Sequence, residues 1–176
     1  MDTFKMKIAG LERELPIFKI NDNLSIAAFI LFGDVEITEA SSRELLKKVP
    51  EFDVILTPEA KSIPLAYEMS RQSGKPYIVA RKAVKVYMDN PIRVDVKSIT
   101  TQKVQTLYLG QEDIVKLKGM KVLIVDDVIS TGDSLKAVKQ LAVESEGEIV
   151  GCCAVLAEGD ASLRDDIIFL EPLPLL

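Results

Sequence analysis

Residues 122–134 of the chain read VLIVDDVISTGDS, and this stretch decides the fold. Its first four residues are apolar and three of them are β-branched, which is typical of a strand buried on both faces of a parallel sheet. The pattern predicts that this strand ends at two adjacent carboxylates, Asp126 and Asp127. Apolar residues then recur at helical spacing from Leu135 onward. The stretch therefore predicts a strand, a short polar turn and a helix N-terminus at the centre of an α/β domain.

The polar turn has the composition of an anion site. The backbone N–H groups of residues 130–134 can converge on a phosphate, three hydroxyl side chains add donors, and the helix dipole favours negative charge. Gly132 permits a close approach of the backbone. Asp126 and Asp127 would repel a bare phosphate, so the ligand that fits carries hydroxyl groups as well. A 5-phosphorylated ribose meets both requirements, whereas an ordinary strand–helix turn with an Asp near the cap is the alternative.

Taken as a whole, residues 122–134 strongly resemble the PRPP-binding signature of type I phosphoribosyltransferases. The resemblance implies that Asp126 and Asp127 are catalytic and that Mg²⁺ is the cofactor, held through PRPP with these two carboxylates as candidate ligands. It also implies that the ribose and its 5-phosphate are bound by Asp126, Asp127, Val128, Ile129, Ser130, Thr131, Gly132, Asp133 and Ser134.

Composition narrows the class of protein. The chain has 176 residues, of which 48% are hydrophobic and 28% charged, as in a globular protein. A net charge of −5 argues against a broad nucleic-acid-binding surface, and no apolar run approaches the length of a membrane span. The absence of His excludes His-based triads. Cys152 and Cys153 lie in an apolar run and are expected to pack in the core, so we expect a cytoplasmic protein without direct nucleic-acid or membrane binding.

The pattern along the chain predicts a single domain over residues 1–176. Residues 1–50 are expected to form a small β-rich hood with strands at 15–20 and 26–32, followed by a helix over 39–49 that Thr38 caps. The rest, residues 51–176, is expected to form a parallel twisted sheet flanked by helices, starting with a right-handed βαβ unit whose helix follows Ser62 and ends at Gly74. The expected strands of this core are 52–57, 76–81, 121–126, 148–156 and 167–170.

Residues 83–110 interrupt this alternation of strands and helices. Two alternating segments, 92–96 and 104–109, stand where a crossover helix would be expected, with the polar tract 97–103 between them. A long insertion of this kind is often functional, so we expect a flexible β lid that closes over the site. The alternative is a β-hairpin that only decorates the sheet.

The loop after the first core strand, residues 57–62, is a second candidate anion site at a helix N-terminus. It resembles the loop of adenine phosphoribosyltransferases that usually reads Glu-Ala-Arg-Gly. The resemblance implies pyrophosphate binding, with Lys61 in place of Arg, which keeps the charge but loses the bidentate fork. The implied pyrophosphate ligands in this loop are Glu59, Ala60, Lys61 and Ser62.

Three cations follow the next strand, Arg81, Lys82 and Lys85. By themselves they would be a solvated basic cluster. The resemblance implies that they bind pyrophosphate, that Lys82 is also catalytic, and that the protein is a homodimer, since such residues can reach the site of a neighbouring subunit.

The segment 31–38 resembles the hood segment Phe-Arg-Asp-Ile-Thr of adenine phosphoribosyltransferases. The resemblance implies that Phe32 stacks on a purine base and that Gly33 lies beside it, although Phe32 could instead be a core residue at a strand end. Ser130 is implied to lie near the purine ring, where a small residue favours adenine over 6-oxopurines.

The sequence therefore predicts an enzyme of purine salvage that transfers the 5-phosphoribosyl group of PRPP to a purine base, adenine first. Two alternatives stay open. One is an enzyme for hypoxanthine, guanine or xanthine. The other is a non-catalytic regulator that senses PRPP; the insertion, with its Arg-Lys-Ala-Val-Lys-Val run, also resembles purine-sensing repressors built on the same domain.

Overall fold

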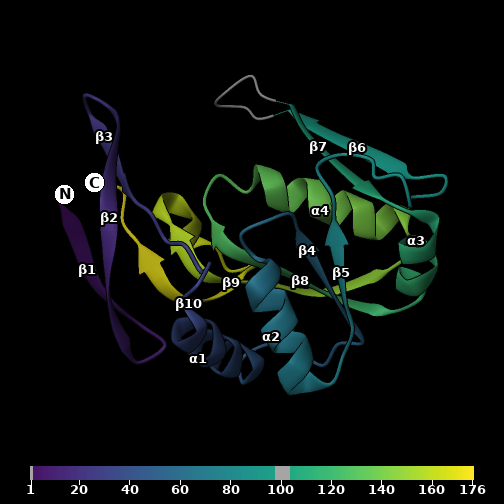
Figure 1. The fold of residues 1–176 in the computed structure, drawn as a ribbon, viewed down its shortest axis with the longest axis horizontal. Coiled ribbons are helices and arrows are strands. Elements are labelled where there is room, and N and C mark those ends of the chain that lie inside the picture. The colour runs from purple at the N-terminus through teal and green to yellow at the C-terminus, as the bar shows by residue number, and fades with distance from the viewer. Residues whose placement is uncertain (1, 98–103) are drawn as a thin grey trace.

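The computed structural model describes residues 2–97 and 104–176. Three β-sheets and four α-helices make up the described chain (Figure 1). The strands are β1 (Thr3–Ile8), β2 (Leu11–Asn21), β3 (Leu24–Ala27), β4 (Val54–Pro58), β5 (Tyr77–Ala80), β6 (Ile92–Lys97), β7 (Val104–Leu109), β8 (Lys121–Ile129), β9 (Glu148–Glu158) and β10 (Ile168–Leu173). The helices are α1 (Val35–Leu46), α2 (Ile63–Ser73), α3 (Gln111–Leu117), α4 (Asp133–Glu144) and the 3₁₀ turn η1 (Gly159–Leu163).

A five-stranded parallel sheet in the order β10-β9-β8-β4-β5 forms the centre of the fold. Successive side chains of its strands point to opposite faces and build two separate cores. Leu56 and Ile124 face α3, α4 and the β6–β7 hairpin, whereas Ile55 and Leu123 face α1, α2 and the N-terminal strands. Both faces are therefore covered, which explains why these strands are continuous apolar runs. The predicted α/β class with a parallel sheet flanked by helices is confirmed.

The N-terminal sheet, β1-β2-β3, is antiparallel and packs beside the same face as α1. The C-terminal tail returns to it, because the backbone of Leu176 pairs with Ser25 of β3 through two hydrogen bonds of 2.6 and 3.0 Å. Figure 1 shows the two chain ends close together there. The predicted β-rich N-terminal segment is confirmed.

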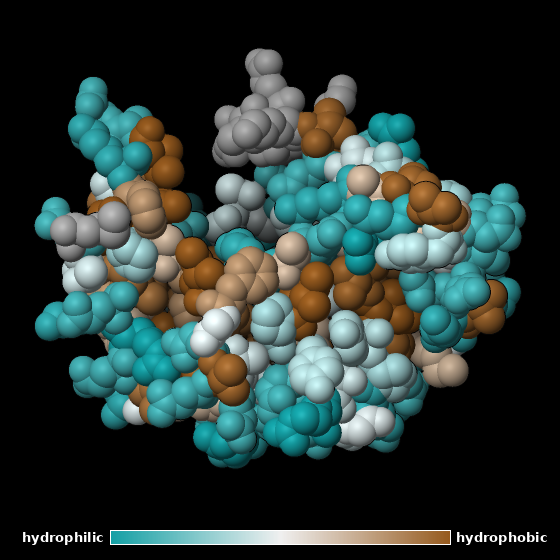
Figure 2. All heavy atoms as spheres, viewed as in Figure 1, coloured by the Kyte–Doolittle hydropathy of each residue, from teal (hydrophilic) through white to brown (hydrophobic). Residues whose placement is uncertain are grey.

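The β6–β7 hairpin of the predicted lid is antiparallel and packs on α4 through Val94 and Leu107. A bridge between Arg81 and Tyr108 ties it to the end of β5. Figure 2 shows an open notch between the N-terminal sheet and this hairpin. Most of the polar tract 97–103 lies outside the described residues, so closure of the lid stays a prediction.

The structure corrects the predicted start of the first helix and the predicted end of the strand before it. Helix α1 begins four residues before Glu39, because Asp34 and not Thr38 accepts the capping hydrogen bond, from the N–H of Ile37 at 3.1 Å. The chain leaves the N-terminal sheet after Ala27, since Phe29 and Leu31 are buried in the core rather than paired in a strand.

The other two corrections concern β8 and α3. β8 does not end at the carboxylates but continues to Ile129, whose side chain is buried. Helix α3 was missed because it has only seven residues, no side-chain cap and a single buried residue, Leu117. Such a segment carries no helical periodicity strong enough to read. Among the described residues, no helix combines the length and the apolar character that crossing a membrane would require.

One glycine at the end of α4 gives a test of the packing. A Cβ at Gly147 would lie 2.8 Å from Val122 and 3.2 Å from the carbonyl oxygens of Ala142 and Leu117, so the backbone would have to shift. Gly147→Ala should lower the free energy of unfolding by about 1–3 kcal/mol in urea denaturation. Gly110→Ala is the control, because its Cβ would make only ordinary contacts with Met88 at 3.5 Å. Equal losses in both variants would contradict the packing seen at Gly147.

Candidate functional site

The candidate site lies at the carboxyl ends of β4, β5 and β8, where the loops of adjacent parallel strands meet. Thr57 at the end of β4 links two of these loops, since its Oγ1 lies 2.8 Å from both Ser62 Oγ and the carbonyl oxygen of Val125 in β8. Ser62 in turn donates to the carbonyl of Pro58 at 2.9 Å. These buried hydroxyls fix the loop 59–62 against the end of β8.

The two carboxylates at the end of β8 have different surroundings. Asp127 is buried, with 3% of its surface exposed, whereas Asp126 is half-buried. Asp126 Oδ1 accepts a hydrogen bond of 2.9 Å from the backbone N–H of Asp127. Burial, followed by the charge of Asp127, raises the pKa of Asp126 well above its ordinary value, and the nearby Lys61 opposes this only in part. Asp126 therefore holds its proton more strongly than a free aspartate does.

Lys61 connects the loop after β4 to this pair. Its Nζ lies 2.9 Å from Asp127 Oδ2, and its side chain is 54% exposed. The ion pair lacks the angles of a hydrogen bond, so within the described residues Asp127 Oδ2 is a buried acceptor without a hydrogen-bond donor. A buried carboxylate oxygen in this state favours a ligand hydroxyl or a cation.

The loops after β4 and β5 are held together by Glu59. Its Oε2 accepts a hydrogen bond of 2.9 Å from the backbone N–H of Lys82 and lies 3.3 Å from Arg81 Nε. Arg81 Nε is buried and has no acceptor with hydrogen-bond geometry in the part of the chain that the structure describes. The side chain of Lys82 is exposed, and Lys85 is half-buried in a turn closed by the N–H of Met88. The structure thus joins Glu59, Arg81 and Lys82, while Lys85 has no hydrogen bond or ion pair to them among the described residues.

Two of the predicted phosphate- and ribose-binding residues lie in strand β8 rather than in the turn that follows it. Val128 and Ile129 belong to β8, opposite Leu156 and Ala157 of β9, and their side chains pack in the two cores. Residues 130–134 form the turn itself. Together with Asp126, Val128, Ile129 and Leu135 they line a small cavity of about 40 Å³.

Inside the turn, Gly132 adopts the left-handed conformation, with φ +81°. Thr131 Oγ1 donates to the carboxylate of Asp133 at 3.0 Å. Ser134 Oγ donates to Gln105 Oε1 of β7 at 2.7 Å, so the hairpin already contacts the turn.

Three residues at this edge were missed by the sequence reasoning. A guanidinium nitrogen of Arg164 lies only 2.6 Å from the place a Cβ of Gly132 would take, and two hydrogen bonds of 2.8 Å to Asp166 fix that guanidinium. Gln105 is the partner of Ser134. Glu158 ends β9 with its pKa raised by burial. No local motif marks these residues. Arg164 and Gln105 reach the turn only through tertiary packing, and Glu158 lies at the end of the neighbouring strand β9.

The segment predicted to contact a base lies beside α1. Leu31 is buried, but Phe32 is 55% exposed, so the alternative that Phe32 is a core residue is wrong. Gly33 adopts a φ of +83°. No hydrogen bond or ion pair joins Phe32 or Gly33 to Ser130 within residues 2–97 and 104–176. A cavity of about 530 Å³ opens next to Gly33, between α1 and α2, and was not predicted.

The electrostatics of the carboxylate pair can be tested directly. Asp127→Asn removes the neighbouring charge and should lower the pKa of Asp126, which ¹³C carboxyl titration by NMR would follow. Because the raised pKa makes ionised Asp126 unfavourable in the fold, its contribution to stability decreases as the pH rises above the unfolded value of about 3.9. Asp126→Asn should therefore raise the free energy of unfolding at neutral pH. An unchanged pKa in the Asp127 variant would contradict this coupling.

Comparison with known proteins agrees with this geometry. Residues 34–171 match the model of the phosphoribosyl transferase domain. The chain is 32% identical over 162 residues to an adenine phosphoribosyltransferase of Thermosipho africanus, covering 91% of this chain and 92% of that protein. It is 33% identical over 134 residues to a hypoxanthine/guanine phosphoribosyltransferase of Methanococcus voltae, covering 76% of this chain and 68% of the relative.

The chain is also similar to a transcriptional regulator. The purine biosynthesis transcriptional repressor PurR of Bacillus subtilis is 30% identical over 125 residues, which cover 70% of this chain but 43% of the repressor. Among solved structures, adenine phosphoribosyltransferase from Thermoanaerobacter pseudethanolicus superposes with a TM-score of 0.75 at 20% identity, covering 90% of this chain and 95% of that one. The sequence matches and the fold agree, and the chain belongs to the type I phosphoribosyltransferase family.

Proposed function

We propose that the protein transfers the 5-phosphoribosyl group from PRPP to a purine base, with adenine as the preferred base, and releases pyrophosphate. The observation that carries the proposal is a pair of complementary buried groups. Among residues 2–97 and 104–176, Asp127 Oδ2 near the end of β8 finds no hydrogen-bond donor, and Arg81 Nε at the end of β5 finds no acceptor. A ligand with sugar hydroxyls and a pyrophosphate would satisfy both groups.

In this proposal the phosphate turn anchors the 5-phosphate. The N–H groups of residues 130–134 and the start of α4 favour the dianion, and Arg164 adds positive charge behind Gly132. Ser134 exchanges its hydrogen bond with Gln105 for one to the phosphate. Binding energy from this remote group then fixes the position of the reacting carbon.

During transfer, the bond from ribose C1 to pyrophosphate oxygen breaks while a bond to a purine nitrogen forms. Positive charge develops on the ribose and negative charge on the leaving group. Asp126 and Asp127 accept hydrogen bonds from the ribose hydroxyls and favour the positive ring. Lys61, Arg81, Lys82 and Lys85 are the proposed cations for the departing pyrophosphate.

Mg²⁺ fits the donor set at the carboxylate pair. Asp126 and Asp127 offer the oxygen ligands that Mg²⁺ prefers, and one of these oxygens is without a donor. No cluster of three or more potential metal-binding side chains occurs in the described part of the chain. The remaining ligands would therefore come from PRPP, and the ion would supply charge neutralisation for the leaving group.

Phe32 is the proposed stacking partner of the base, since its ring is exposed at the end of a buried segment. Ser130 and Gly33 leave room for the base edge. A 6-oxopurine is the alternative substrate, supported by the similar identity to the Methanococcus enzyme.

A homodimer is part of the proposal. Val35 and Tyr67 are exposed by 75% and 56% beside the cavity between α1 and α2, and a second subunit would cover them. We place the protein in the cytoplasm, a compartment that suits its two free and buried thiols, Cys152 and Cys153.

A PRPP-sensing role without catalysis is the second candidate. It is supported by the similarity to PurR and by the engagement of Lys61 with Asp127, which leaves this cation less available to pyrophosphate.

The first test measures pyrophosphate release from PRPP and Mg²⁺ with adenine, hypoxanthine, guanine and xanthine in separate reactions. We expect release with adenine, and a loss of about 10²-fold or more in kcat for Asp127→Asn, because the developing positive charge loses its partner. Asp113→Asn, which changes a carboxylate of α3 away from the site, should leave kcat unchanged. PRPP binding without release for any base would instead support the sensor.

The second test concerns the phosphate turn. Gly132→Ala places a side chain at positive φ and against Arg164, so the affinity for PRPP in isothermal titration calorimetry should fall about tenfold. Gly74→Ala is the matched control, because Gly74 also has positive φ (+71°) but lies at the end of α2 with open space around it. Equal PRPP affinity in both variants would remove the turn from the phosphate site.

A further inference from the structure

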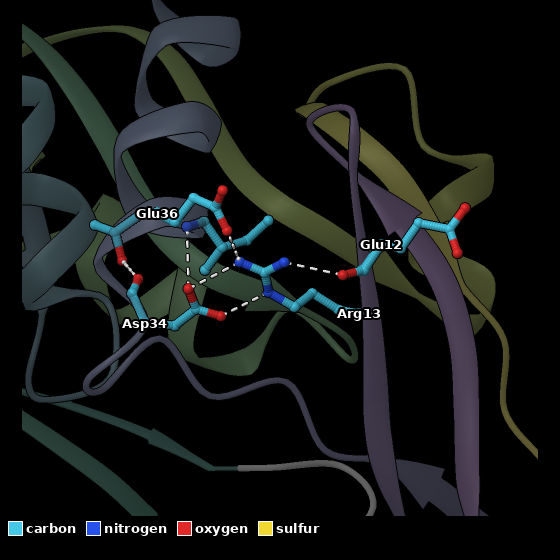
Figure 3. Close-up of polar contacts among 6 residues, drawn as sticks. Glu12, Arg13, Asp34 and Glu36 are labelled. Carbon is cyan, nitrogen blue, oxygen red and sulfur yellow. Dashed lines mark hydrogen bonds and ion pairs between the residues drawn. The ribbon is translucent and has the colours of Figure 1, made fainter.

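One guanidinium joins the N-terminal sheet to the start of α1 (Figure 3). Arg13 of β2 donates to both carboxylate oxygens of Asp34, at 2.7 Å from Nε and 3.0 Å from one terminal nitrogen. The same terminal nitrogen donates to Glu36 at 2.9 Å, and the other donates to the carbonyl of Glu12 at 2.9 Å. Such a fork matches a carboxylate in both distance and direction, which a single ammonium cannot do.

Asp34 is fixed from several sides at once. Its Oδ1 also accepts the N–H of Ile37 and so caps α1, while its backbone N–H donates to the carbonyl of Leu31 at 3.1 Å. The carbonyl of Asp34 accepts the hydroxyl of Thr38 at 2.7 Å. The position of Asp34 therefore determines where the first turn of α1 begins.

This contact is partly shielded from water. The side chains of Arg13 and Asp34 are 24% and 32% exposed, whereas those of Lys5 and Glu14, an ion pair within the N-terminal sheet, are 74% and 57% exposed. The hydrogen bond from Arg13 lowers the pKa of Asp34, and the hydrogen bonds to Asp34 and Glu36 raise the pKa of Arg13. Both groups are thus held charged over the neutral range.

The residues between Leu31 and Asp34 have little else to hold them. Leu31 is 1% exposed and is anchored in the core, whereas Phe32 is exposed and Gly33 has no atom within 4 Å of the place of a Cβ. The orientation of Phe32 is thus set by two anchors, the buried Leu31 before it and the Arg13–Asp34 contact after it.

We propose that Arg13 is a positioning residue for the base, which holds Phe32 and Gly33 in place by fixing Asp34 from the N-terminal sheet. The inference rests on the proposed function, because it takes this segment as the contact to the purine. Arg13 itself does not touch substrate. It makes the N-terminal sheet a determinant of base affinity and leaves the PRPP site independent of that sheet.

The test compares Arg13→Gln and Arg13→Lys with the control Lys5→Gln, which removes the exposed ion pair of the same sheet. For Arg13→Gln we expect KM for the accepted base to rise about tenfold, because one charge-assisted contact to Asp34 is lost. The Kd for PRPP, measured by calorimetry, should stay unchanged. Arg13→Lys should lie between wild type and Arg13→Gln. Lys5→Gln should match wild type.

Hydrogen–deuterium exchange of residues 31–38 gives a second readout that needs no turnover. Arg13→Gln should speed exchange in this segment and leave α4 unaffected. Equal effects of Arg13→Gln and Lys5→Gln, a parallel rise in the PRPP Kd, or unchanged exchange would each overturn the proposal. If wild-type protein turns over no base, the proposed function fails by itself. Exchange then decides separately whether Arg13 fixes the segment.

Discussion

The burial of Asp127 at the end of β8 is the constraint on which the site depends. A parallel sheet covered on both faces leaves polar groups only at the ends of its strands, and β8 lies in the middle of the sheet. A buried carboxylate at that place needs a cation or a hydrogen-bond donor in place of the water it has lost. Lys61 provides the charge at 2.9 Å without the geometry of a hydrogen bond. The site is therefore stable as it stands, yet incomplete.

The loop after β5 also contains a buried polar group without a hydrogen-bond partner among the described residues. Glu59 lies between the backbone of Lys82 and the side chain of Arg81, so that it fixes the loop after β5 without fully satisfying the guanidinium. An unsatisfied acceptor and an unsatisfied donor on neighbouring loops form a polarised site. The acidic side suits sugar hydroxyls and a cation, and the basic side suits a pyrophosphate. Buried polar groups without partners are typical of functional sites. A protein optimised for stability alone would have paired the oxygen of Asp127 and the nitrogen of Arg81 with other groups.

The N-terminal sheet contributes through contacts rather than through ligands. Arg13 reaches from β2 to the cap of α1, and the tail at Leu176 pairs with Ser25 of β3, so this sheet is tied to the core from two sides. The hairpin is tied in a similar way, by the bridge from Arg81 to Tyr108 and by the bond of Ser134 to Gln105. The contacts of Arg13, Tyr108 and Gln105 each end at a segment for which the sequence predicts binding.

The apolar run 122–125 and the polar residues 130–134 determined by themselves the α/β class, the central strand and the turn that leads into α4, because strand burial and helix initiation are local properties of the chain. The resemblance of residues 122–134 to the family signature also depends only on the local sequence, and the match of residues 34–171 to the family model confirms it. Local sequence patterns gave wrong helix boundaries where long-range packing determines the structure. The capping residue of α1 is Asp34 and not the predicted Thr38, and α3 forms although its sequence shows no helical spacing of apolar residues.

Only the tertiary structure decided which charges meet. The pairing of Lys61 with Asp127, of Glu59 with Arg81 and of Arg13 with Asp34 joins residues 66, 22 and 21 positions apart, as their numbers give. No spacing rule encodes such contacts, since they depend on the order of parallel strands and on where each loop returns. The sequence supplied the chemical groups of the site, and the sheet order brought them together at one edge.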